Sequence, residues 1–185
     1  MRMNDEQQLI ADFRKGKSEA QKKIFELHAT AMLAVCARYV RDRETARDLL
    51  QDGFIKVFEK AESYSGAGSL GGWMRRIFVN TALEYLRQHD ALKMSLSIDD
   101  HNDAFESNDI SAIDKITTDD LLSCVAQLPD GFRTVFNLYA IEGYSHSEIA
   151  GMLNINEVTS RTQYMRARNQ LQKSVLTLMS VKNAK

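Results

Sequence analysis

Cysteine and proline are scarce in this sequence, which holds two cysteines and one proline in 185 residues and has no long apolar run. Cys36 and Cys124 lie 88 positions apart without a Cys-x-x-Cys spacing, so neither a disulfide framework nor a zinc site is expected. No stretch reaches the roughly 18 uncharged apolar residues of a membrane span, and the N-terminus lacks an apolar signal segment. Since free thiols suit a reducing compartment, we predict a cytoplasmic protein with no membrane span.

An excess of one charge is also absent, because the formal net charge is −1. The local balance differs from this average: residues 91–116 hold 2 basic and 6 acidic residues, are rich in Ser, Asn and Asp, and show no sustained period. We interpret this segment as an acidic flexible linker between a first domain, residues 1–90, and a second domain, residues 117–185. Two roles stay open for the linker: a solvated tether, or a mimic of nucleic acid in a basic channel.

Helical periodicity dominates both flanking segments, and no segment alternates between apolar and polar residues as a strand does. We therefore predict an all-α fold of two small helical domains. The expected helices cover residues 4–16, 18–40, 42–64 and 73–88 in the first domain, and 118–128, 129–143, 145–153 and 156 onward in the second. Ser18 is expected to cap the second helix, Pro129 to open the sixth at its first position, and the Gly/Ser-rich stretch 65–72 to form a loop.

Two helices of the first domain are strongly amphipathic. In the third helix the apolar residues follow a regular spacing of three and one: Ala46, Leu49, Leu50, Gly53, Phe54, Val57, Phe58 and Ala61. In the fourth helix the apolar side consists of Met74, Ile77, Phe78, Thr81, Ala82, Tyr85 and Leu86. Its other side carries Arg76, Asn80, Glu84 and Arg87. Each helix is expected to bury one stripe and expose the other side.

The stretch SHSEIAGMLNINEVTSRTQYMRAR, residues 145–168, has the pattern of a helix-turn-helix, in which a second helix enters the DNA major groove. Residues 154–185 hold 6 basic residues against 1 acidic residue, which favours phosphate contacts. The expected buried stripe of the second helix is Ser160, Tyr164, Ala167 and Leu171. The expected exposed side is Val158, Arg161, Thr162, Met165, Arg166 and Asn169. A solvated face or a protein contact remains the alternative use of this side.

Individual residues of this helix suggest specific contacts. Arg161 lies near the helix N-terminus and is expected to meet base edges, since arginine binds guanine O6 and N7 in bidentate fashion. Thr162 and Met165 offer a hydroxyl and an apolar contact. Arg166 and Arg168 are expected to contact phosphate. Ser160 is unusual in a buried stripe, and it either bonds back to a carbonyl one turn earlier or lets the two helices approach closely.

These motifs carry a resemblance to a known family. The stretch LPDGFRTVFNLYAIEGYSHSEIAGMLNINEVTSRTQYMRARNQLQ resembles region 4, the C-terminal promoter-binding domain, of extracytoplasmic-function (ECF) sigma factors of bacterial RNA polymerase. The stretch ETARDLLQDGFIKVFEKAESYSGAGSLGGWMRRIFVNTALEYLRQ resembles region 2 of the same proteins. The two matches are collinear and are separated by a linker, as in the family. The resemblance implies an alternative sigma factor that binds core polymerase and directs initiation at promoters with −35 and −10 elements.

The resemblance implies two surfaces in the first domain. The helix containing DLLQDGFIKVF would dock on the clamp coiled coil of the polymerase β′ subunit, with polar contacts from Asp48, Gln51, Asp52 and Lys56. The loop at residues 65–72 and the helix after it would read the −10 element, with one base of the melted strand flipped into a pocket formed by the loop. Candidate residues are Ser65, Ser69, Trp73, Arg75, Arg76 and Asn80. Trp73 has an alternative role, which is to pack the loop onto the helix.

In region 4 the resemblance places −35 contacts on Thr159, Arg161, Thr162, Met165, Arg166 and Arg168. Many relatives have glycine at the Val158 position, an aliphatic residue at Ser160 and arginine at Gln163, although the Thr-Ser-Arg-Thr-Gln pattern occurs in a subset of them. The family also implies a contact with the β flap, a linker that threads toward the active-centre cleft, and an anti-sigma factor as partner. The free protein is expected to be a monomer.

Two other classes of protein are weighed against this interpretation. A repressor or activator that shares only the helix-turn-helix would need a sensor or receiver domain, and residues 1–90 show no such pattern. An enzyme would need a catalytic constellation, but His28, His89, His101 and His146 are scattered, and no Walker A, G-x-S-x-G or metal motif occurs. We therefore expect no catalytic activity and no cofactor or metal.

Overall fold

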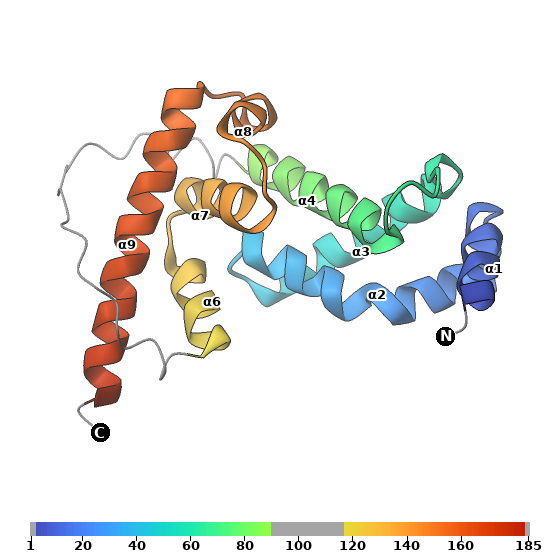
Figure 1. Cartoon of the computed structure of the whole chain (residues 1–185), viewed down its shortest axis with the longest axis horizontal. Helices are drawn as coiled ribbons and strands as arrows, with labels where there is room; N and C mark the ends of the chain where they lie inside the picture. Colours follow the sequence, from blue (N-terminus) through green and yellow to red (C-terminus); the bar gives the residue numbers. More distant parts are fainter. Residues whose placement is uncertain (1–2, 90–116, 184–185) are drawn as a thin grey trace. The chain divides into compact units, whose positions relative to one another are not determined.

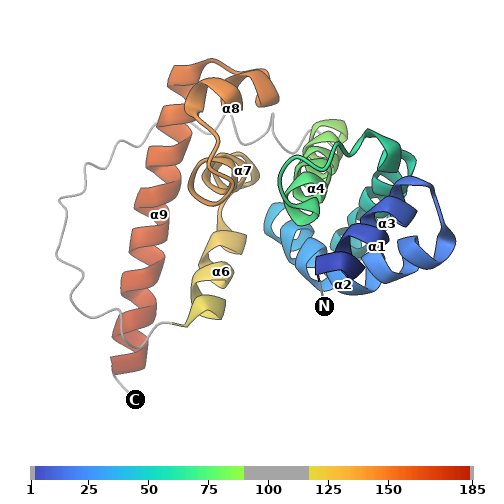
Figure 2. The same ribbon diagram turned by 45° about the vertical axis from the view of Figure 1, so that its right-hand side comes forward.

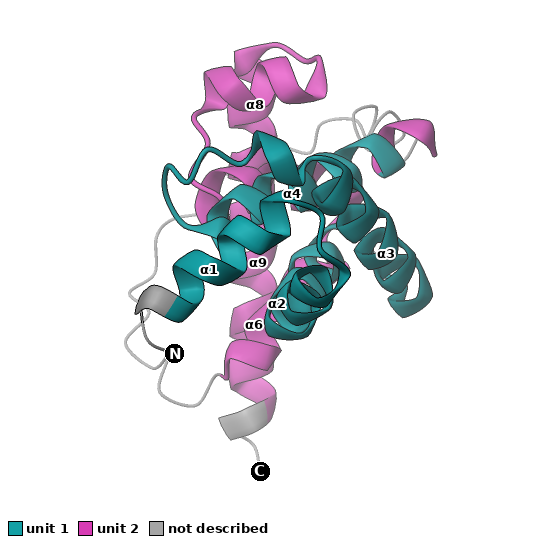
Figure 3. Ribbon diagram, turned by 90° about the vertical axis from the view of Figure 1, so that its right-hand side faces the viewer, with its two compact units in different colours: residues 1–85 teal, residues 86–185 magenta. Residues whose placement is uncertain are grey.

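The computed structural model describes residues 3–89 and 117–183, which form two compact units divided between residues 85 and 86 (Figure 3). The described residues are helical throughout, apart from turns and short connections, and contain no strand. The predicted all-α fold is therefore confirmed for this part of the chain. The predicted linker, residues 91–116, lies outside the described residues, so the exact domain boundaries stay a prediction.

The first unit contains α1 (Met3–Arg14), α2 (Ser18–Tyr39), α3 (Arg43–Glu59), the short 3₁₀ turn η1 (Ala61–Ser63) and all of α4 (Leu70–Gln88) except its last three residues, in the order shown in Figure 1. The turn after α1 passes through Gly16, whose φ of 70° suits a residue without a side chain. Asp42 caps α3 by accepting a hydrogen bond of 2.7 Å from the backbone N–H of Thr45. The expectation for Ser18 is wrong, because Ser18 is the first residue of α2 and Lys17 occupies the cap position.

The core of the first unit joins α3 to α4, which runs along α2 and α3 in Figures 1 and 2. The predicted stripe of α3 is buried or partly buried, and Gly53 is required within it because a Cβ at this position would overlap the ring of Phe78. The stripe predicted for α4 is too narrow. Val79 and Leu83 are also buried, with exposures of 1% and 0%, because α4 is covered around most of its circumference.

The second unit contains α6 (Thr118–Gln127), α7 (Asp130–Phe136), the π-helical turn η3 (Asn137–Ile141), α8 (His146–Leu153) and α9 (Glu157–Asn183). Thr117 and Asp120 form a capping box at the start of α6. Pro129 lies one position earlier than predicted, at the cap of α7. The following helical stretch ends at Ile141, two residues before the predicted end at Gly143, whose φ is 80°. Figure 2 shows α6 lying along α9 and α8 lying at the N-terminal end of α9.

The core of the second unit contains Leu128, Phe132 and Ala167. A buried arginine supports it, since Arg133 is only 1% exposed. Its Nη1 donates to the carbonyls of Leu128 and Ala126 at 3.1 and 3.2 Å, and its Nη2 donates to Asp130 Oδ1 at 2.6 Å. Arg133 therefore binds the last carbonyls of α6 to the first turn of α7, a role that sequence periodicity did not indicate.

Three further findings concern the described residues. Cys36 and Cys124 are both free and buried, and burial raises the pKa of the Cys36 thiol to about 12. None of the described helices combines the length and apolar content that crossing a bilayer would require. Within residues 3–89 and 117–183, no three His, Cys, Asp or Glu side chains gather as a metal site.

Candidate nucleic-acid interface

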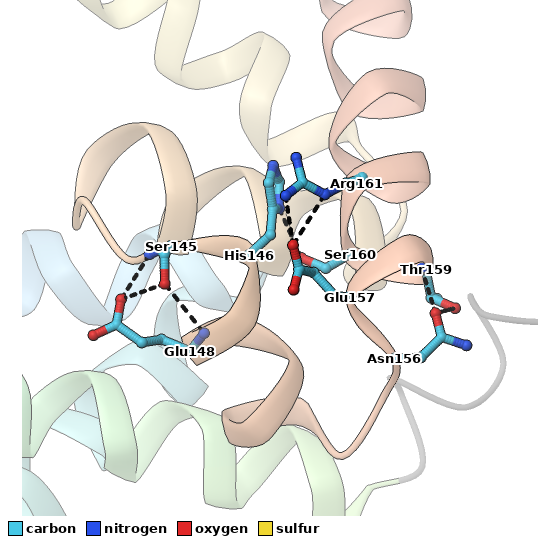
Figure 4. A network of polar contacts seen from close by, with 8 residues as sticks. All are labelled: Ser145, His146, Glu148, Asn156, Glu157, Thr159, Ser160 and Arg161. Atoms are coloured by element: carbon cyan, nitrogen blue, oxygen red, sulfur yellow. Dashed lines mark hydrogen bonds and ion pairs between the residues drawn. The ribbon is translucent and has the colours of Figure 1, made fainter.

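Two capped helices with a short turn between them form the predicted helix-turn-helix (Figure 4). Ser145 and Glu148 make a reciprocal capping box at the start of α8. Asn154 ends α8 in the left-handed conformation, with φ 54° and ψ 47°. Asn156 Oδ1 then accepts hydrogen bonds from the backbone N–H of Thr159 at 2.7 Å and from its hydroxyl at 2.9 Å. These side chains fix the direction in which α9 leaves the turn.

The contact between α8 and α9 contains a buried polar pair. His146 Nδ1 lies 2.9 Å from the Oγ of Ser160, and both side chains are buried. The Ser160 hydroxyl therefore bonds across to α8, so neither of the roles expected from the sequence describes it fully. The His146 ring also stacks on Tyr139, with centroids 4.2 Å apart and planes 10° apart. Burial, followed by the nearby charge of Arg161, lowers the pKa of His146 below its ordinary value.

The outward side of α9 is largely the predicted one. Val158 and Met165 are 72% and 64% exposed, and Arg161, Thr162 and Arg168 are exposed as well. Arg166 is partly buried and has an interaction partner within the chain, so only part of its surface is on the outward side. Gln163 joins the buried stripe with an exposure of 5%, which the spacing of Ser160, Tyr164 and Ala167 did not reveal.

Arg161 is held by an acidic neighbour on its own helix. Glu157 Oε1 accepts hydrogen bonds from Nε and Nη2 of Arg161, at 3.2 and 2.5 Å. This arrangement occupies one edge of the guanidinium and leaves the Nη1 donors for a further acceptor. Glu157 was not predicted as a partner of Arg161, although a spacing of four residues on a helix is the signal that reveals such pairs.

The hydroxyls on this helix are partly occupied by backbone contacts. Thr162 Oγ1 donates to the carbonyl of Val158 at 2.9 Å, and the Thr159 hydroxyl donates to the cap residue Asn156. Each oxygen keeps lone pairs for a donor from outside the protein. Thr162 is therefore available as a hydrogen-bond acceptor at an exposed position.

A second candidate surface lies in the first unit, at the loop before α4. The Tyr64 hydroxyl donates to the carbonyl of Gly68 at 2.8 Å and closes this loop. Gly66 and Gly68 have φ values of 83° and 77°, which explains the glycines of the predicted loop. Ser69 Oγ accepts from the backbone N–H of Gly72 at 3.1 Å and caps α4. The helix consequently begins at Leu70, three residues before the predicted start.

The candidate residues around this loop differ in their surroundings. Ser65 is exposed, and its Oγ accepts a hydrogen bond of 3.3 Å from Ala67 N–H. The Trp73 ring lies against Tyr64, with centroids 5.3 Å apart, and against Phe13 at 6.4 Å. These contacts favour the packing role for Trp73. A hollow of about 410 Å³ opens beside Ser69, between α1, α2 and the start of α4.

The polar side of α4 continues this surface. Arg76 and Asn80 are exposed, whereas Arg75 is partly buried and has a partner within the chain. The structure thus places Arg76 and Asn80 on α4 and Ser69 at its cap. Arg75 has an intramolecular partner that was not predicted, whereas the contacts of Trp73 are those of its alternative packing role.

A third surface is the outward side of α3. Asp48, Gln51 and Asp52 are exposed, as predicted for contacts with another protein. Lys56 is partly buried, and its Nζ lies 2.5 Å from Glu84 Oε2 on α4, so part of its charge is neutralised within the unit. Ile55 is 54% exposed in the middle of this side and was not singled out from the sequence. Its exposure could have been predicted from the sequence, because Ile55 is an aliphatic residue that lies outside the regular apolar stripe of α3.

The chain has a helix-turn-helix with an outward basic face and a second helical unit. These features are typical of DNA-binding proteins that act in transcription. Comparisons with known proteins narrow this class. Residues 24–91 match the family model of Sigma-70 region 2, and residues 118–171 match that of Sigma-70 region 4. The chain belongs to the extracytoplasmic-function sigma factors of the sigma-70 family.

Individual relatives agree with this assignment. The RNA polymerase sigma-H factor of Pseudomonas aeruginosa is 26% identical over 94% of this chain and 95% of its own length. The ECF RNA polymerase sigma factor SigE of Mycolicibacterium smegmatis is 31% identical, over 78% of this chain and 57% of its own. Among solved structures, the sigma factor RpoE in complex with the anti-sigma factor NepR from Bartonella quintana has a TM-score of 0.51 at 21% identity. That match covers 83% of this chain and 95% of RpoE, and at this identity it shows that the two chains share a fold.

Proposed function

We propose that this chain is an alternative sigma factor, which binds core RNA polymerase and directs transcription initiation at promoters with −35 and −10 elements. The observation that carries the proposal is the outward side of α9, where exposed Arg161 and Arg168 lie on a helix that is rigidly capped for entry into a major groove. Phosphodiester synthesis belongs to the polymerase, so the chain itself needs no cofactor and no catalytic group.

The −35 element is read by α9. Arg161 uses its free Nη1 edge on guanine, Thr162 accepts a hydrogen bond, and Met165 adds an apolar contact. Arg168 and the exposed part of Arg166 contact phosphate, and Thr159 lies beside the helix N-terminus, where phosphates bind favourably. This division of roles gives one strongly base-specific position and several contacts that contribute affinity without sequence preference.

The −10 element is read by the loop that Tyr64 closes and by the exposed side of α4. Ser65, Ser69 and Asn80 supply polar groups for unpaired bases, and Arg75 and Arg76 supply positive charge. The hollow beside Ser69 is a place for a base flipped from the melted strand, lined by apolar side chains such as Leu9 and Leu27. Trp73 contributes by holding the loop on α4 through its contacts with Tyr64 and Phe13.

Core polymerase is bound through the outward side of α3, where Asp48, Gln51 and Asp52 surround the exposed Ile55. The partner on this side is the clamp coiled coil of β′, and the second unit contacts the β flap. Lys56 contributes through its pair with Glu84, which orders the adjoining edge of α3. The acidic linker, which lies outside the described residues, threads toward the active centre.

An anti-sigma factor keeps the free protein inactive by covering its polymerase-binding surfaces. Support comes from a solved structure of the same fold, the sigma factor RpoE, which was co-crystallised with the anti-sigma factor NepR. The protein acts in the cytoplasm, where polymerase and chromosome are found, and is a monomer until it joins the polymerase.

A run-off transcription assay tests the proposal. Purified bacterial core polymerase is supplied with this chain and a library of genomic fragments, and transcripts are mapped to their start points. We expect transcripts from a small set of start points that share −35 and −10 sequences. Core polymerase that gains no promoter-specific transcript would refute the proposal, and binding of the isolated chain to a palindromic operator would favour a repressor instead.

A further inference from the structure

Two large apolar side chains lie on the side of α9 that is otherwise polar and basic. Val158 is 72% exposed and Met165 is 64% exposed, the highest values among the exposed large hydrophobic residues described in this chain. Such exposure means that neither side chain contributes much burial to the helical unit. Solvent-exposed apolar groups within a functional surface point to a contact made only when a partner is bound.

The positions of the two side chains define which part of a partner they reach. At about 100° per residue, Val158, Arg161, Thr162 and Met165 fall within an arc of about 100° on the helix. Val158 precedes Arg161 by one turn, and Met165 follows it by one turn. The two apolar groups therefore flank the arginine whose Nη1 donors are free, and they lie on its side of the helix.

The chemistry of a major groove fits this pattern. The groove edge of a guanine offers two acceptors to an arginine, while the only apolar group that any base pair presents there is the 5-methyl of thymine. The exposed charges of Arg161 and Arg168 select a polyanion as the partner of this side of the helix. An apolar pair within a basic surface is therefore matched better by thymine methyls in DNA than by an uncharged protein surface.

We propose that Val158 and Met165 are specificity-determining residues that contact thymine 5-methyl groups in the −35 element, on either side of the base pair read by Arg161. This inference rests on the proposed function, and it adds that the −35 element must contain thymines at two particular positions. Met165 follows Val158 by seven positions, which corresponds to about 10.5 Å along the helix. The two thymines accordingly lie at most about three base pairs apart, at about 3.4 Å per base pair, because a helix inclined to the DNA axis spans fewer.

The test replaces thymine by uracil, which removes the methyl group and keeps the base pairing. The −35 element is first defined by selection of promoter duplexes with the full-length chain bound to core polymerase. Each thymine of that element, on either strand, is then changed to uracil in turn, and the affinity of the holoenzyme is measured by competition. We expect two positions at which uracil weakens binding about threefold to fivefold, the scale of one buried methyl-sized group.

Variants assign each position to its side chain. Val158→Ala should abolish the uracil effect at one position and Met165→Ala at the other, each without loss of helical circular dichroism. Val181→Ala is the matched control, because Val181 is an apolar residue of α9 that is 53% exposed and lies beyond the helix-turn-helix. This control should keep both uracil effects unchanged.

The possible results separate this inference from the proposed function. A holoenzyme that selects no promoter sequence refutes both. A holoenzyme that selects promoters without a thymine in the −35 element, or that ignores every uracil replacement, overturns the methyl contacts alone. Uracil effects that persist in both alanine variants also overturn them, because other residues would then contact the methyl groups.

Discussion

The imidazole of His146 and the hydroxyl of Ser160 form a buried hydrogen bond of 2.9 Å that joins the two helices of the DNA-binding motif (Figure 4). The pair lies at the first residue of α8 and in the first turn of α9. Since the residues next to Ser160 reach outward, the pair fixes the rotation of α9 about its axis. A serine in a helix interface is thus explained by its partner rather than by its own helix.

Ser160→Ala is expected to destabilise the second unit by about 1–3 kcal/mol, because it leaves the buried Nδ1 of His146 without a hydrogen-bond partner. Urea unfolding of the full chain, followed through the amide NMR signals of residues in the second unit, measures the change. In a His146→Leu background the same substitution should cost much less. An equal cost in both backgrounds would mean that the hydrogen bond is not the cause.

Sequence periodicity predicted most of this fold because its helices are amphipathic and their ends carry strong cap residues. Asp42, Ser145 and Asn156 are local signals, and each one caps a helix in the structure. Periodicity did not predict Val79, Leu83 or the buried Arg133, since their burial depends on how many helices surround a position. A single helix pattern contains no information about such neighbours.

In the candidate site, too, the sequence predicted the exposed side of a helix but not the contacts between helices. The exposed side of α9 followed from spacing, whereas the pairing of His146 with Ser160 required knowledge of how two helices cross. Lys56 illustrates a further point: the family resemblance implied a contact with polymerase, and the structure also gives Lys56 a partner, Glu84, inside the first unit. For Trp73 both a base contact and internal packing were open, and its contacts with Tyr64 and Phe13 favour packing. Residue type and spacing indicate what a side chain could bind, but not what it already contacts.

Acid is expected to weaken the second unit through His146. Its pKa is below the ordinary value in the folded chain, so the unfolded chain binds a proton first as the pH falls. Stability is therefore greatest above the unfolded pKa of about 6.5 and declines as the pH drops from there toward the folded pKa. Urea midpoints between pH 8 and pH 5 measure this decline.

A matched pair of variants assigns that decline to one residue. His146→Gln should flatten the pH dependence of the second unit, whereas His28→Gln should leave it in place, because His28 belongs to the first unit. Burial also lowers the pKa of His28, so His28→Gln should flatten the corresponding transition of its own unit. A pH profile of the second unit that is unaffected by His146→Gln would contradict the assignment.

Arg161→Ala is expected to cost about 1–3 kcal/mol of promoter binding and to relax the preference at one −35 position. Glu157→Gln tests the orientation of Arg161 separately. Losing the carboxylate removes a negative charge near DNA, so binding to nonspecific duplex should strengthen, while the preference for the cognate base should fall because Arg161 is no longer held. Competition binding with cognate and single-base variant duplexes gives both quantities. A loss that is equal for all sequences after Arg161→Ala would identify Arg161 as a phosphate contact.

Ile55→Ala is expected to weaken binding to core polymerase about fivefold, since the minority of interface residues that cost more than about 1 kcal/mol on truncation cluster near the centre of an interface. The free chain should keep its stability, because Ile55 is 54% exposed and packs little within the first unit. Leu27→Ala is the matched control: Leu27 is 55% exposed, but it lies on α2 and lines the hollow beside Ser69. Fluorescence anisotropy of labelled chain titrated with core polymerase measures both variants without DNA. If the two variants bind alike, the outward side of α3 does not face the polymerase, and the assignment of Asp48, Gln51 and Asp52 fails with it.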